Sequence, residues 1–84
     1  MLMGKVIGHI VSTRKNEKLV GSKILEVQLV EDEKVTDKYL VALDTIGAGI
    51  GEMVLITTGS SARLAMDRES VPTDAVIVGI IDAK

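Results

Sequence analysis

Residues 23–30 read KILEVQLV and contain the clearest structural pattern in the chain. Apolar residues in this segment alternate with Glu26 and Gln28. An alternation with a period of two places apolar side chains on one face of a β-strand and polar side chains on the other. The segment therefore predicts a strand that is buried on one face and exposed to solvent on the other.

Four other segments are rich in β-branched or aliphatic residues, which favours strands over helices. They are residues 5–13 (KVIGHIVST), 38–43 (KYLVAL), 52–58 (EMVLITT) and 74–82 (DAVIVGIID). Residues 14–22 and 31–37 separate the first three predicted strands. The first is a polar loop and the second a charged hairpin tip, and we expect both to be solvated.

A short helix is expected within residues 59–66, between the fourth and fifth strands. Ser60 or Ser61 would cap its first N–H groups, and Pro72 would end the excursion before the last strand. This order of elements predicts a mainly β fold, a five-stranded OB-like β-barrel with one short helix between strands four and five. The length of 84 residues allows one domain, covering residues 1–84.

The composition argues against several classes of partner and cofactor. The chain has no cysteine, so it can form neither a disulfide framework nor a thiolate zinc site. A net charge of −2, with both signs interspersed, provides no basic surface for nucleic acid or for an anionic membrane. No apolar run approaches the roughly 18 residues of a membrane span. We therefore expect a cytosolic protein with no cofactor and no nucleic-acid or membrane partner.

Two predicted strands are apolar on both faces. Residues 75–81 read AVIVGII without alternation, and residues 5–13 include Val6, Ile7 and two further β-branched apolar residues. A barrel wall has only one interior face, and the sequence offers almost no helix to cover the other. We therefore predict that the outer faces of these strands form subunit interfaces.

No combination of residues predicts a catalytic or metal site. His9 is the only histidine and has no cysteine with which to share a metal. The serines of residues 59–63 would need His9 and an aspartate such as Asp44, and they lack the G-x-S-x-G context of such a nucleophile. The carboxylates of the EDEK run at 31–34 are interpreted as solvated charges.

Residues 47–51 read GAGIG and superficially match part of a dinucleotide-binding loop. That motif must follow a strand and open a helix within a βαβ unit, whereas this segment opens a strand. The glycines are better explained by positive φ angles or by close approach of the backbone to a neighbouring segment or subunit. As a plain loop, the segment would need no function.

The predicted barrel also allows an alternative function, that of a monomeric OB-type module for a nucleic acid or a small ligand. Such barrels bind single strands by stacking bases on exposed aromatic side chains in a basic groove. Tyr39 is the only aromatic residue of the chain. The stacking platform is therefore missing, and a structural role is favoured over this alternative.

Four blocks of residues carry a resemblance to a known family. They are GHIVST at 8–13, DTIGAG at 44–49 with GE at 51–52, GSSAR at 59–63, and PTD at 72–74 leading into VGIID at 78–82. On these blocks the chain resembles the EutN/CcmL family, the pentameric vertex proteins of carboxysome and metabolosome shells. The resemblance extends over residues 3–82. It departs at Met53, where many members have an aromatic residue, and at Lys84, where many continue, so we expect any C-terminal interface to be shorter or absent.

The resemblance implies a structural shell protein of a bacterial microcompartment and not an enzyme. Its homopentamers would cap the vertices of a polyhedral shell in the cytoplasm and introduce curvature among hexameric shell proteins. The glycine loop, residues 45–51, would approach the five-fold axis and border a narrow pore with Thr45, Ile46, Gly47, Ala48, Gly49, Ile50 and Gly51. The residues expected at the subunit interface are Glu52, Arg63, Val76, Val78 and Ile80.

Overall fold

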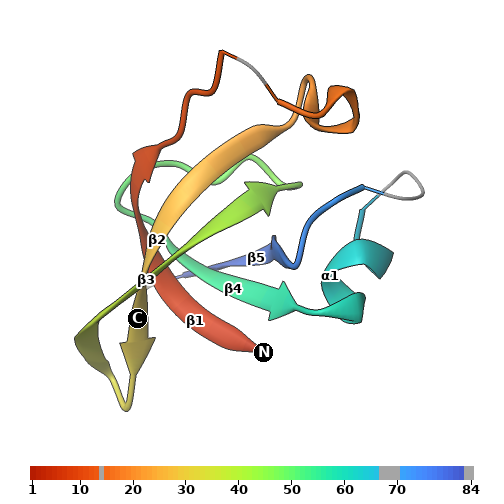
Figure 1. Ribbon diagram of the computed structural model, residues 1–84. Coiled ribbons are helices and arrows are strands. Elements are labelled where there is room, and N and C mark those ends of the chain that lie inside the picture. Colours follow the sequence, from red (N-terminus) through yellow and green to blue (C-terminus); the bar gives the residue numbers. More distant parts are fainter. Residues whose placement is uncertain (14, 67–70, 83–84) are drawn as a thin grey trace.

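The computed structural model describes residues 1–13, 15–66 and 71–82. Its elements are β1 (Leu2–His9), the 3-10 helix η1 (Glu17–Leu19), β2 (Lys23–Glu31), β3 (Lys34–Asp44), β4 (Met53–Thr58), α1 (Ser60–Leu64) and β5 (Ala75–Ile81). The strands form a closed barrel in the order β1-β2-β3-β5-β4, with β4 paired back to β1 (Figure 1). This arrangement confirms the predicted five-stranded barrel with one short helix between β4 and β5.

The interior of the barrel confirms the alternating pattern of residues 23–30. Leu25, Val27 and Leu29 are buried, whereas Glu26 and Gln28 between them are only partly buried. Side chains from every strand and from the glycine loop complete this barrel core. Its buried members are Val6, Leu25, Val27, Leu29, Ala42, Ala48, Val54, Ile56, Ala75 and Ile77.

A glycine allows β1 to approach β2 closely. Gly4 is buried and pairs with Leu29 of β2 and with Val54 of β4. A Cβ atom at this position would collide with Cγ1 of Val27 and would lie 2.9 Å from the carbonyl oxygen of Gln28. Because one obstacle is a side chain of the barrel core and the other is backbone of β2, the close contact between the strands requires a residue without a side chain.

A second, smaller core lies on the outer side of the barrel wall. Val76 belongs to it, whereas the adjacent Ile77 belongs to the barrel core, as expected for neighbours that point to opposite faces of β5. The buried members of this outer core are Leu43, Ala62, Val71 and Val76. Leu19, Ile24, Ala65, Met66 and Val78 pack against it.

The outer core corrects one prediction about the subunit interface. We expected another subunit to cover the outer face of β5, but Ala62 of α1 and Val71 cover the first half of that face within the protomer. Val76 has an exposed fraction of 0%, so it has no surface to contribute and its predicted interface role is wrong. The second half of β5 remains accessible, and Ile80 is 38% exposed.

The ends of β1 and β3 differ most from the predicted ones, because backbone pairing extends or ends elsewhere. β1 spans Leu2–His9, not residues 5–13, because its N-terminal half pairs with β4. Ile10 and Val11 therefore lie after the strand, and both are exposed. The predicted hairpin tip at 31–37 is confirmed, but its turn is only a pair of residues with positive φ, so most of that segment is strand.

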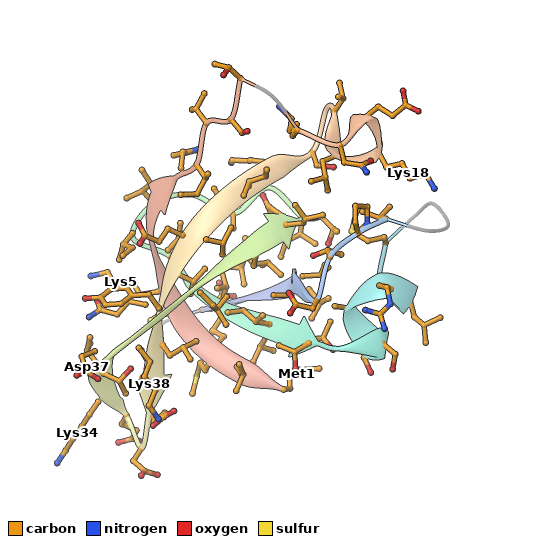
Figure 2. The ribbon with its side chains drawn as sticks, in the orientation of Figure 1. Met1, Lys5, Lys18, Lys34, Asp37 and Lys38 are labelled. Carbon is orange, nitrogen blue, oxygen red and sulfur yellow. The ribbon has the colours of Figure 1, made fainter. Side chains whose placement is uncertain are left out.

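The same hairpin projects from the barrel (Figure 1), and Lys34, Asp37 and Lys38 lie toward its far end (Figure 2). Its turn consists of Asp32 and Glu33, with φ angles of 52° and 64°. These angles are those of a type I′ turn, whose twist matches that of the two flanking strands. The charged run thus marks a tight turn with solvated side chains.

The helix begins in the predicted place but is capped differently. Gly59, with a φ of 68°, precedes α1, and no side chain accepts a hydrogen bond from the first turn. The prediction that Ser60 or Ser61 caps the helix is therefore wrong, because the chain enters the helix through a glycine conformation that L-residues rarely adopt. In the predicted loop 14–22, residue 14 lies outside the described residues, and Leu19 of η1 is half-buried against the outer core.

Candidate functional site

The glycine loop runs from the end of β3 to the start of β4, beside β1 (Figure 1). Asp44, the last residue of β3, holds the first part of this loop. Its Oδ1 accepts a hydrogen bond from the backbone N–H of Ile46 at 3.1 Å, and its Oδ2 accepts one from the N–H of Ala48 at 2.8 Å. The Asp44 side chain is only 1% exposed, so both oxygens are directed into the protein.

Lys23 connects the same carboxylate to the middle of the loop. It is the first residue of β2 and lies opposite Asp44 in the β2–β3 pairing. Its Nζ donates a hydrogen bond to the carbonyl oxygen of Ala48 at 2.7 Å and lies 3.9 Å from Oδ2 of Asp44. One cation therefore contacts both the buried carboxylate and the loop backbone.

Glu52 holds the second part of the loop. Its Oε1 accepts a hydrogen bond from the N–H of Gly49 at 2.7 Å, and its own N–H donates to the carbonyl oxygen of Gly49 at 3.1 Å. Val6 of β1 bonds to the last two residues of this segment, accepting from the N–H of Gly51 at 2.8 Å and donating to the carbonyl oxygen of Glu52 at 3.0 Å. The Glu52 carboxylate, predicted at a subunit interface, thus has a partner within its own protomer.

The glycines of the loop have different structural roles. Gly47 and Gly51 have φ angles of 85° and 93°, which confirms the prediction of positive φ at these two positions. Gly49 is not among the residues with positive φ, and a Cβ atom there would meet Oε1 of Glu52 at an ordinary 3.5 Å. The backbone conformation therefore requires glycine at Gly47 and Gly51 more than at Gly49.

The side chains of the loop divide between core and surface. Ala48 is fully buried in the barrel core, whereas Ile46 and Ile50 are 42% and 60% exposed. Residues 45–51 contain no titratable side chain, and the flanking carboxylates of Asp44 and Glu52 accept hydrogen bonds from the loop itself. The loop therefore presents backbone and aliphatic surface to its surroundings.

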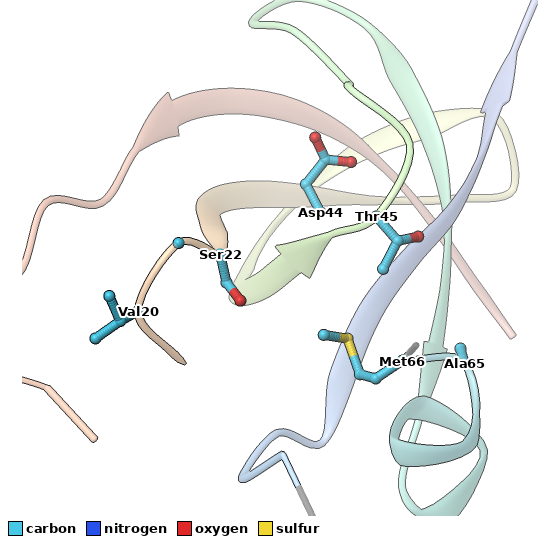
Figure 3. Close-up of a pocket in the computed structure, with 7 residues that line it drawn as sticks. Val20, Ser22, Asp44, Thr45, Ala65 and Met66 are labelled. Carbon is cyan, nitrogen blue, oxygen red and sulfur yellow. The ribbon is translucent and has the colours of Figure 1, made fainter. Parts of the chain in front are cut away.

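A half-open cavity of about 620 Å³ lies beside the start of the loop (Figure 3). In Figure 3 the carboxylate of Asp44 points away from Met66. Thr45 Oγ1 donates to the carbonyl oxygen of Ile77 at 2.8 Å. The polar groups of Asp44 and Thr45 are thus engaged within the protein. The cavity is lined by Val20, Gly21, Ser22, Asp44, Thr45, Ala65 and Met66.

The other predicted site residues are spread over α1 and β5. Arg63 is exposed on α1, and its guanidinium donates to the carbonyl oxygen of Thr73 at 3.4 Å. Val78 is half-buried against the outer core, and Ile80 is exposed. Their place in an interface stays a prediction. The alternation rule could have assigned Val76 to the face opposite Ile77, but the sequence contained no signal that α1 and Val71 cover that face.

Within the described ranges, no three His, Cys, Asp or Glu residues lie close enough together to hold a metal ion. His9 is exposed at the end of β1. Among the same residues, no helix is both long and apolar enough to cross a membrane.

Comparisons with known proteins identify one family. The model of the family described as ethanolamine utilisation protein EutN/carboxysome matches residues 1–82. The bacterial microcompartment shell vertex protein GrpN of Rhodospirillum rubrum is 46% identical over 83 residues, which cover 98% of this chain and 93% of that protein.

Two solved structures have the same fold as this chain. The structure of Gloeobacter violaceus CcmL matches with a TM-score of 0.92 and 43% identity, covering 98% of this chain and 86% of that one. The GrpN pentameric microcompartment shell protein from Rhodospirillum rubrum matches with a TM-score of 0.86 and 44% identity, covering 99% and 94%.

Proposed function

The chain belongs to the EutN/CcmL family, and we propose that it is a structural shell protein that forms homopentamers at the vertices of a bacterial microcompartment. The observation that carries this proposal is the extent of the similarity. It spans nearly the whole chain and includes the barrel, the glycine loop and β5, and one of the matching structures is a pentameric shell protein. The monomeric binding module is not favoured.

Geometry supplies the mechanism of a vertex protein. Hexameric tiles alone cover a flat sheet, and a closed shell requires five-fold units to introduce curvature. We propose hexameric shell proteins as the partners at the rim of the pentamer. In a cyclic assembly each subunit contacts its neighbours through two different surfaces, so one chain can form the whole pentamer.

The exposed apolar residues support contacts of this kind. Ile46 and Ile50 on the loop, Val41 and Tyr39 on β3, and Ile80 on β5 are all more than a third exposed. These side chains are accessible on the protomer and are therefore available for contacts with neighbouring subunits. The glycine loop is proposed to lie near the five-fold axis, where five copies would meet.

We also propose that the chain has no catalytic activity. Asp44, the aspartate considered for a hydrolase triad, accepts two backbone hydrogen bonds from the glycine loop. Its carboxylate therefore acts on the conformation of the loop. The subunit interface is proposed to include Glu52, Arg63, Val78 and Ile80.

Native mass spectrometry of the full chain tests the assembly. The expected result is a species with the mass of five 9.0 kDa chains at micromolar concentration. A stable monomer under these conditions would contradict the proposal. Binding of single-stranded nucleic acid at low salt, measured on the same sample, would instead favour the alternative module.

Electron microscopy of mixtures tests the role in the shell. A hexameric shell protein alone is expected to form sheets or tubes, and addition of this chain should convert them to closed polyhedra. If the chain forms pentamers but the sheets remain unchanged, the proposed role at the vertices is contradicted although the proposed oligomeric state is not.

A further inference from the structure

The glycine loop obtains its hydrogen bonds from its own protomer. The N–H groups of Ile46 and Ala48 donate to Asp44, that of Gly49 donates to Glu52, and that of Gly51 donates to Val6. These donor–acceptor distances lie between 2.7 and 3.1 Å, which is the ordinary range for such bonds. No second subunit is needed to complete this set.

The electrostatic centre of the arrangement is buried. A carboxylate that is 1% exposed is destabilised unless it has hydrogen bonds and a counter-ion, and Asp44 has both. Lys23 lies 3.9 Å from it, and the same ammonium group holds the Ala48 carbonyl at 2.7 Å. The N–H and the carbonyl of Ala48 are therefore bound to opposite members of one ion pair.

Packing of the side chain also holds the loop at Ala48. The Ala48 side chain is fully buried in the barrel core, while Ile46 and Ile50 on either side are exposed. The loop is thus fixed by its central residue and presents its two isoleucines outward. A loop held in this way loses little conformational entropy when subunits associate.

We infer that Asp44, with Lys23 as its counter-ion, is the positioning residue of the glycine loop, and that the loop has its final conformation before the subunits assemble. Only a role of this conformation in a pore rests on the proposed function. The inference that the loop is preformed does not depend on it.

Hydrogen exchange of individual backbone amides, followed by NMR on the full chain, tests the positioning role. In Asp44→Asn, one oxygen becomes an NH2 donor, so the amide of Ile46 or of Ala48 loses its acceptor. Its exchange is expected to accelerate about tenfold or more, as for loss of a hydrogen bond to a charged group. The strand amides of β1 and β4 should keep their rates.

The matched control is Asp37→Asn, the same change at an exposed position of the same strand, and it should leave loop exchange unchanged. Equal loop exchange in the wild type and in Asp44→Asn would overturn the inference. Should Asp44→Asn fail to fold, Lys23→Met gives the decision, because it removes the counter-ion at a side chain that is 41% exposed. This variant frees the Ala48 carbonyl and leaves Asp44 without its counter-ion, so the loop should open more readily and the amide of Ala48 should exchange faster. Unchanged exchange would again overturn the inference.

The order of events is tested on the wild-type chain at two concentrations. Where native mass spectrometry shows single protomers, the amides of Ala48 and Gly49 should already be protected, to the same degree as is expected in the pentamer. Protection that appears only on assembly would refute a preformed loop. If no pentamer forms at any concentration, the proposed function fails, while exchange in the protomer still decides the present inference.

Discussion

Replacement of Gly4 by alanine tests how closely β1 and β2 must approach in the barrel. The added methyl group would collide with Val27 and would lie 2.9 Å from the carbonyl oxygen of Gln28. Overpacking of this kind costs typically about 1–3 kcal/mol, and we take the upper value because one obstacle is backbone. The substitution also reduces the conformational freedom of the unfolded chain, which offsets about 0.4–1 kcal/mol of this loss in stability. We therefore expect Gly4→Ala to lower the free energy of unfolding by about 2 kcal/mol.

The same strand supplies the control. A Cβ atom at Gly8 would have its nearest neighbour 3.8 Å away, at Oε1 of Glu26, so Gly8→Ala should be neutral or stabilising by up to about 1 kcal/mol. The two variants should thus differ by about 2–3 kcal/mol, which is a large fraction of the roughly 4–13 kcal/mol expected for a domain of this length.

Urea unfolding, followed by circular dichroism, measures this difference. Protein concentration is kept equal across variants, because dissociation of an oligomer contributes to its apparent stability. Equal unfolding midpoints for Gly4→Ala and Gly8→Ala would refute the reasoning, since the two substitutions differ in the contacts of the added methyl group.

Three further predictions concern the loop and β5. Gly47→Val should impair the loop and pentamer formation, because φ is 85° and the left-handed conformation costs an L-residue about 1–2 kcal/mol, whereas Gly49→Ala should assemble normally by native mass spectrometry. Val76→Ala should lower protomer stability in a thermal melt through a buried cavity, while Ile80→Ser should weaken assembly with little effect on the melt; the opposite pattern would contradict the burial argument. Ile50→Lys should leave stability within about 0.5 kcal/mol but abolish pentamers if five loops meet at an axis, and intact pentamers would place the loop elsewhere.

Much of the fold followed from local patterns. The alternation in residues 23–30 identified β2 and its buried face, because side-chain direction in a strand depends only on a period of two. The runs of β-branched residues located the other strands, although several ends were misplaced. Strand ends depend on which backbone groups find partners, as in the pairing of residues Leu2–Lys5 with β4.

The helix cap and the outer core were beyond the reach of such patterns. Ser60 and Ser61 had the chemistry of caps, but Gly59 enters α1 with a positive φ and no side chain caps the first turn. Val76 was correctly expected to need cover on the outer face of β5. The cover comes from Ala62 and Val71 of the same chain, and this contact follows from the path of the chain in space.

For the candidate site, the sequence alone predicted positive φ angles at glycines of the loop. It also showed that residues 45–51 contain no titratable side chain. It also carried the family resemblance that pointed to a vertex protein. The tertiary structure decided what the flanking charges do, because Lys23 is 21 residues from Asp44 along the chain and meets it only through the β2–β3 register. Burial then made that pair significant: a carboxylate removed from water must find its partners nearby, and here those partners are the backbone of the loop.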